Sequence, residues 1–81
     1  MVEKINQPID VLCAFVKGKA MPVYFRWDNK RYKVDKVNLV HSTRNGRDKN
    51  YFYSVSENTN YYKLCFSTER NNWTLSEACF A

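Results

Sequence analysis

The chain has 81 residues, the size of one small domain, and a net charge of +5 at pH 7. Its six Tyr, five Phe and two Trp supply the apolar area that a core needs at this length. No apolar run approaches the roughly 20 residues of a membrane span, and residues 1–8 lack the pattern of a secretory signal. We therefore expect no membrane segment and a cytoplasmic location.

Three cysteines, Cys13, Cys65 and Cys79, lie in apolar segments at spacings too wide for a C-x-x-C pair. Since a metal site needs more ligands and His41 is the only histidine, we expect free thiols packed as small apolar groups. Thiols of this kind are typical of the reducing cytosol.

In chain order, residues 1–8 are expected to form an N-terminal arm that ends at Pro8. Residues 9–16 are apolar on both sides and rich in β-formers, so we expect a strand there. A short helix that begins at Asp10 is the alternative, because an acidic cap precedes the apolar run.

Residues 22–34 show the clearest pattern in the chain, two alternating strands around Asp28 and Asn29. Asn tolerates the positive φ of a type I′ turn, so this turn predicts Phe25 opposite Tyr32. It also places Arg26 opposite Arg31 on the other face, and such like-charge pairs are destabilising. The pair requires open solvation, a neighbouring acid or an anionic partner.

The second strand of this hairpin is expected to continue to His41, with a β-bulge at residues 35–36 that restores its apolar face. Residues 42–50, which contain Asn45-Gly46 and four charges, are predicted to be a mobile polar loop.

Residues 51–56 and 61–66 predict a second hairpin in which Val55 faces Tyr62. A turn at residues 69–72 leads to a last strand, 73–80, with Trp73 and Leu75 next to Phe66 and Leu64; residues 76–81 are also compatible with a helical turn. The chain is therefore predicted to be a single all-β domain, residues 1–81, with about six short antiparallel strands in a meander. Such a meander is typical of a strongly curved sheet or a small barrel.

The hairpin pattern Phe25-x-Trp27-x-x-Lys30-Arg31-Tyr32-x-Val34, with the later Trp73-x-Leu75, resembles a small bacterial domain family of unknown function. That family has an F-x-W-x-G-[KR]-x-Y-x-V hairpin and a later W-x-L strand, and the resemblance spans roughly residues 20–76. Asn29 stands where the family usually has Gly, and Asn can adopt the same left-handed conformation. Some relatives are encoded beside translesion DNA polymerase genes, so the resemblance implies a link to DNA transactions.

The sequence contains no enzyme signature such as a P-loop, a G-x-S-x-G elbow or H-E-x-x-H. His41 lies at the end of an expected strand beside Ser42, with Asp35 nearby and no evident oxyanion hole. We therefore expect a non-enzymatic binding domain with no catalytic residue, metal or cofactor.

The basic residues are the best candidates for function. Residues 17–49 carry ten Lys or Arg against three Asp, so nearly all of the positive excess lies there. Aromatic and cationic groups interleaved on a curved sheet suit single-stranded nucleic acid. The predicted nucleic-acid-binding residues are Tyr24, Arg26, Lys30, Arg31, Lys33, Arg44, Arg47 and Lys49.

Two other interpretations remain open. The same charges are also compatible with a solvated face that keeps a small β protein soluble. A homodimer or a protein partner is the alternative function, through apolar surface at residues 11–15 or around Phe52 and Tyr61.

Overall fold

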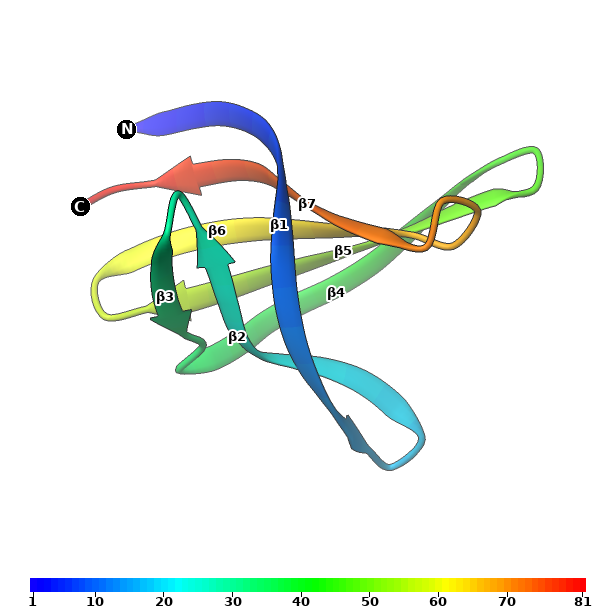
Figure 1. Ribbon diagram of the computed structural model, residues 1–81, viewed down its shortest axis with the longest axis horizontal. Helices are drawn as coiled ribbons and strands as arrows, with labels where there is room; N and C mark the ends of the chain where they lie inside the picture. Colours follow the sequence, from blue (N-terminus) through cyan, green and yellow to red (C-terminus); the bar gives the residue numbers. More distant parts are fainter.

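The computed structural model describes residues 1–81 and contains seven β-strands and no helix (Figure 1). All seven belong to one antiparallel sheet in the order β3-β2-β1-β7-β6-β5-β4. The strands are β1 (Val2–Val16), β2 (Lys19–Trp27), β3 (Lys30–Lys33), β4 (Lys36–Asn45), β5 (Asp48–Glu57), β6 (Asn60–Ser67) and β7 (Asn72–Cys79).

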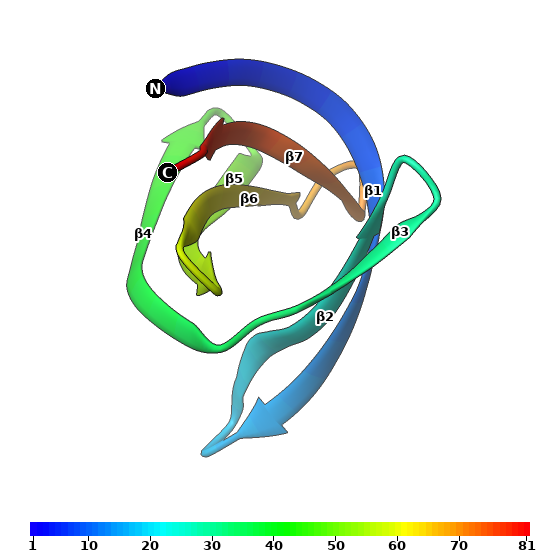
Figure 2. The ribbon, with the colours of Figure 1, turned by 90° about the vertical axis from the view of Figure 1, so that its left-hand side faces the viewer.

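The sheet curves strongly around its core but does not close into a barrel (Figure 2). Its two edge strands, β3 and β4, follow one another in the chain and are joined by Val34 and Asp35. The Val34 amide donates to the Val23 carbonyl at 2.8 Å on one side, and the Asp35 amide donates to the Ser56 carbonyl at 2.9 Å on the other. The linker therefore bridges the two edges of the sheet.

The core lies on the concave side of the sheet, which we call the inner face; the opposite side is the outer face. Phe25, Val55, Leu64 and Leu75 are fully buried there. Phe25 stacks on Tyr32 with ring centroids 4.9 Å apart, as their opposite positions on β2 and β3 require. Side chains from strands at both ends of the sheet thus meet in one core.

Both predicted hairpins are confirmed. Asp28 and Asn29 have φ values of 53° and 61°, as a type I′ turn requires, and Phe25 pairs with Tyr32. In the second hairpin Val55 pairs with Tyr62. The pairs Leu64–Leu75 and Phe66–Trp73 continue the meander as predicted.

The ends of the chain differ from the prediction. Residues 1–8 are not an arm, because β1 already begins at Val2 and its first half pairs with β7, from Val2 opposite Cys79 onward. Residues 9–16 belong to the same strand and residues 72–79 to β7, so neither helical alternative forms. The sheet has seven strands, where about six were expected.

The middle of the chain also differs. In place of the one long strand that was expected to reach His41, the structure has two strands, β3 and β4, at opposite edges of the sheet. There is no bulge at residues 35–36. The register shift lies instead between Val37 and Leu39, so Leu39 turns to the outer face and is 58% exposed. The predicted polar loop at residues 42–50 is the hairpin end of β4 and β5, whose pairing continues to Asn45 opposite Asp48.

No helix of the length and apolarity needed to cross a membrane occurs in the structure.

Candidate nucleic-acid interface

The outer face of the β2–β3 hairpin carries four of the predicted residues side by side. Tyr24 and Arg26 flank the buried Phe25 on β2, so strand alternation directs both to the outer face. Arg31 lies directly opposite Arg26 on β3, and Lys33 lies opposite Tyr24. Both arginines are exposed to solvent.

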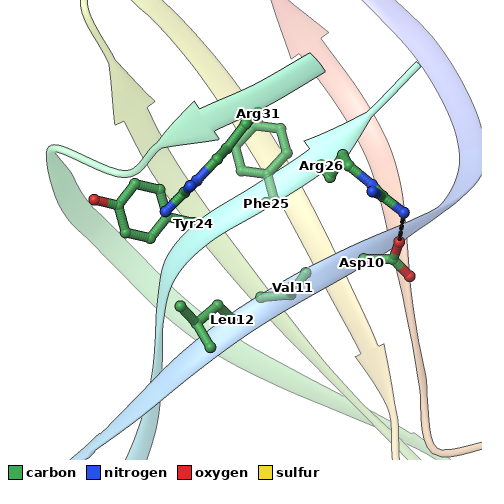
Figure 3. A pocket seen from close by; sticks show the side chains of 7 residues that line it. All are labelled: Asp10, Val11, Leu12, Tyr24, Phe25, Arg26 and Arg31. Atoms are coloured by element: carbon green, nitrogen blue, oxygen red, sulfur yellow. Dashed lines mark hydrogen bonds and ion pairs between the residues drawn. The ribbon is translucent and has the colours of Figure 1, made fainter. Parts of the chain in front are cut away.

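The two facing arginines have different neighbours. An Arg26 Nη2 donates to Asp10 Oδ2 at 3.0 Å, across the β1–β2 pairing that places Asp10 opposite Arg26. Arg31 instead lies over the Tyr24 ring, with Cζ 4.2 Å from the ring centroid (Figure 3). Because the ion pair is exposed, it contributes only about 0–1 kcal/mol. An exposed cation–π contact contributes about as much, roughly 0.5–1 kcal/mol.

These side chains border an open groove, which we call the outer groove, with a volume of about 310 Å³. Leu12 from β1 lines it opposite Tyr24 and is 59% exposed, so the groove also has an apolar surface. Figure 3 shows Arg31 and Tyr24 on one side of the groove and the Arg26–Asp10 pair on the other. The groove is lined by Asp10, Val11, Leu12, Tyr24, Phe25, Arg26 and Arg31.

The remaining predicted residues do not join this group. Lys30 pairs with Trp27 at the hairpin end, so alternation places it on the face opposite Arg31. Arg44, Arg47 and Lys49 lie at the β4–β5 turn, which projects at the right-hand end of the molecule, whereas the β2–β3 turn lies toward the left (Figure 1). The structure therefore divides the predicted set into two basic surfaces.

The second basic surface belongs to the inner face. Lys49 alternates with Tyr51 and the buried Tyr53 on β5, and its Nζ is 5.0 Å from the centroid of the Tyr51 ring. Arg44 lies directly opposite Lys49 on β4, so this hairpin also contains a facing pair of cations. Neither has a carboxylate within 4.0 Å, because the two ion pairs of the molecule are Arg26–Asp10 and Lys63–Glu77.

Sequence reasoning did not include Asp10 and Leu12 in the site. A neighbouring acid was one of the three explanations for the facing arginines, but its position depends on the pairing of β1 with β2. That register contains a shift between Leu12 and Cys13, which no sequence pattern indicates. No local signal could therefore have identified either residue.

His41 is exposed and stacks on Phe52, with ring centroids 5.0 Å apart. The Asp35 carboxylate accepts a hydrogen bond from the Asn58 amide at 2.7 Å. No group of three or more His, Cys, Asp or Glu side chains that could hold a metal ion occurs in the structure.

Burial raises the pKa of two thiols, Cys13 and Cys65, and Asp48 adds to the effect at Cys65. All three cysteines are free. Thiols with a raised pKa are poorer nucleophiles at neutral pH, which suits a packing role.

No protein-family model, no curated protein and no solved structure matches this chain.

Proposed function

We propose that this protein is a small binding domain that takes single-stranded nucleic acid on the outer face of β1, β2 and β3. The observation that carries the proposal is the contact between Arg31 and Tyr24, with Cζ 4.2 Å from the ring centroid, at the edge of the outer groove. A planar guanidinium and an aromatic ring are the groups on which unpaired bases stack.

Charge supports the same interpretation. Arg31 has no carboxylate within 4.0 Å, so it is available to a phosphate without loss of an ion pair. Lys33 is the next residue after Arg31 on the same face of β3. Arg26 is held by Asp10, so in the unaltered protein it contributes positive charge to this face but no phosphate contact of its own.

The test is the binding of labelled single-stranded DNA and RNA at a series of salt concentrations. If phosphates are neutralised, log K falls linearly with log salt, with a slope of about 0.7 per phosphate contact. Arg31→Glu should weaken binding strongly. Arg70→Glu is the matched control, because it reverses the same charge at the exposed β6–β7 turn.

Equal losses in Arg31→Glu and Arg70→Glu would mean that only net charge matters, and would reject the outer groove. No binding of the unaltered protein at low salt would reject the function itself. The double variant Arg26→Glu, Arg31→Glu provides the larger perturbation if the single effect is small.

A second candidate function is contact with a protein, including a second copy of this chain. It is favoured by the exposed apolar side chains at the end of the β1–β2 hairpin, where Phe15 is 81% and Val16 is 52% exposed. Analytical ultracentrifugation over a range of concentrations tests the homodimer. A concentration-independent monomer would remove it, whereas a dimer dissociated by Phe15→Ser would support it.

The cellular setting is part of the proposal. The three free thiols support a reducing cytosol as the place of action. The resemblance of the central hairpin to a bacterial family stays a prediction. The link to DNA transactions that this resemblance implies agrees with the proposed ligand.

A further inference from the structure

A second recess lies on the inner face, at a different place from the outer groove. Its volume is about 590 Å³, compared with about 310 Å³ for the outer groove, and we call it the inner cleft. It is bordered by the β1–β2 hairpin on one side and by β4, β5 and β6 on the other. Its apolar lining consists of Ala20, Met21, Val40, Tyr51, Tyr53 and Phe66.

The cleft is built by regular structure, and a hydrogen bond joins two of its lining residues. The Tyr53 hydroxyl on β5 donates to the Ala20 carbonyl on β2 at 3.0 Å. These strands are not neighbours in the sheet, so the bond fixes their separation across the interior. Tyr53 is buried and its pKa is raised, chiefly by desolvation, which favours the neutral hydroxyl that donates this bond.

The rim of the cleft is cationic. Lys19 lines it, and Lys49 contacts the ring of Tyr51, a lining residue, with Nζ 5.0 Å from the ring centroid. No acidic residue lines the cleft, and neither Lys19 nor Lys49 has a carboxylate within 4.0 Å. Asp48, the nearest acid in sequence, alternates to the outer face and accepts a hydrogen bond from the Ser67 hydroxyl at 2.9 Å.

An apolar interior with an uncompensated positive rim is complementary to one class of ligand. We propose that the inner cleft binds a small anionic amphiphile, a straight-chain carboxylate of the fatty-acid type. Its carboxylate would meet Lys19 and Lys49, and its chain would lie among Val40, Tyr51 and Phe66 above Tyr53. The volume of about 590 Å³ is within the range of ligand pockets, and such sites occur where a curved sheet opens at its end.

The proposal is independent of nucleic-acid binding, because the outer groove and the inner cleft share no lining residue. Either function can therefore fail without affecting the other.

Calorimetric titration of the full chain with hexanoate, octanoate and decanoate tests the proposal. We expect saturable binding of one molecule per chain, with affinity rising about fourfold for each CH₂ added while the chain fits the cleft. The uncharged 1-octanol should bind more weakly than octanoate. The double variant Lys19→Gln, Lys49→Gln should lower the affinity for octanoate about tenfold and leave the affinity for 1-octanol unchanged.

Two neighbouring positions on β4 provide a blocking variant and its matched control. Val40 lines the cleft, so Val40→Trp should fill it and abolish octanoate binding. Leu39 lies on the outer face and is 58% exposed, so Leu39→Trp adds the same bulk outside and should leave binding intact. Both positions are solvent-accessible, and far-UV circular dichroism checks that each variant is folded.

Three results would overturn the proposal. They are the absence of saturable binding for all three carboxylates, equal affinity for octanoate and 1-octanol, and equal loss of binding in Val40→Trp and Leu39→Trp.

Discussion

Arg26 and Arg31 face each other across β2 and β3, yet each guanidinium contacts a different group. Arg26 bonds to Asp10 at 3.0 Å, while Arg31 covers the Tyr24 ring at 4.2 Å. The two facing cations are expected to repel each other, and an opposite charge offsets this repulsion at Arg26 but not at Arg31. Arg31 keeps an unpaired positive charge next to an exposed apolar surface, and this arrangement underlies the first two predictions.

Asp10→Asn should strengthen the binding of single-stranded nucleic acid. The substitution removes a negative charge from the outer groove and frees Arg26 for a phosphate. The slope of log K against log salt should steepen by about 0.7, the value for one more phosphate contact. Glu69→Gln at the β6–β7 turn makes the same charge change elsewhere and should leave the slope unaltered. A slope unchanged by Asp10→Asn would show that Arg26 does not contact the strand.

Tyr24→Leu should weaken nucleic-acid binding without changing its salt dependence. The ring contributes stacking, which is worth roughly 1–3 kcal/mol per base, and carries no charge of its own. Tyr24→Phe keeps the ring and should bind like the unaltered protein. Fluorescence anisotropy at several salt concentrations measures both quantities. Equal affinities for the Leu and Phe variants would contradict a stacking role.

The parts of the fold that the sequence predicted are those that depend on short-range pairing. Both β-hairpins follow from turn residues that adopt positive φ, Asn29 in one and Asn58 in the other. Once such a turn is fixed, alternation determines which residues face each other. The register of the core residues on β2, β3, β5 and β6 could therefore be predicted before any long-range contact was known.

The parts that could not be predicted depend on contacts between distant segments. Val2 pairs with Cys79, so the first half of β1 looks like a free arm until β7 is in place. Leu39 continues the odd-numbered apolar pattern of Val37, yet a register shift between them places Leu39 outside. The same limit applies to the site, because Asp10 reaches Arg26 only through the β1–β2 pairing.

Asn29→Val should destabilise the protein by about 1–2 kcal/mol, the cost of a side chain that is unsuited to the left-handed region. Asn29 has a φ of 61° in the type I′ turn, and a β-branched residue is strained there. Asn29→Gly is the control and should retain or slightly increase stability. Urea denaturation followed by tryptophan fluorescence measures the free energy of unfolding of all three proteins. A harmless Asn29→Val would mean that the hairpin tolerates another turn type.

Leu64→Ala should cost about 2–5 kcal/mol of unfolding free energy, because it leaves a cavity in the centre of the core. Leu64 is fully buried and pairs with Tyr53 on one side and Leu75 on the other. Leu39→Ala removes the same atoms from a side chain that is 58% exposed and should have little effect. Comparable losses for the two variants would contradict the register shift that directs Leu39 outward.

The ion pair between Lys63 and Glu77 should make stability depend on pH in the acidic range. Lys63 Nζ lies 2.8 Å from Glu77 Oε2, across the pairing of β6 with β7. The hydrogen bond from Lys63, together with its charge, holds the pKa of Glu77 below its ordinary value, and Lys4 adds a smaller effect. Because the folded-state pKa is the lower one, the folded chain releases the proton more readily than the unfolded chain. The stabilisation is therefore complete above the unfolded-state pKa and is lost as the pH falls through the folded-state pKa.

Carboxyl-detected NMR titration should show the pKa of Glu77 returning toward its ordinary value in Lys63→Met, with a smaller change in Lys4→Met. The free energy of unfolding of Lys63→Met should approach that of the unaltered protein as acid is added, because both then carry a neutral Glu77. A pKa that does not move in Lys63→Met would show that the contact is absent in solution. A gap in stability that widens toward low pH would contradict the sign of the linkage, since the depressed pKa requires the contribution of Glu77 to disappear there.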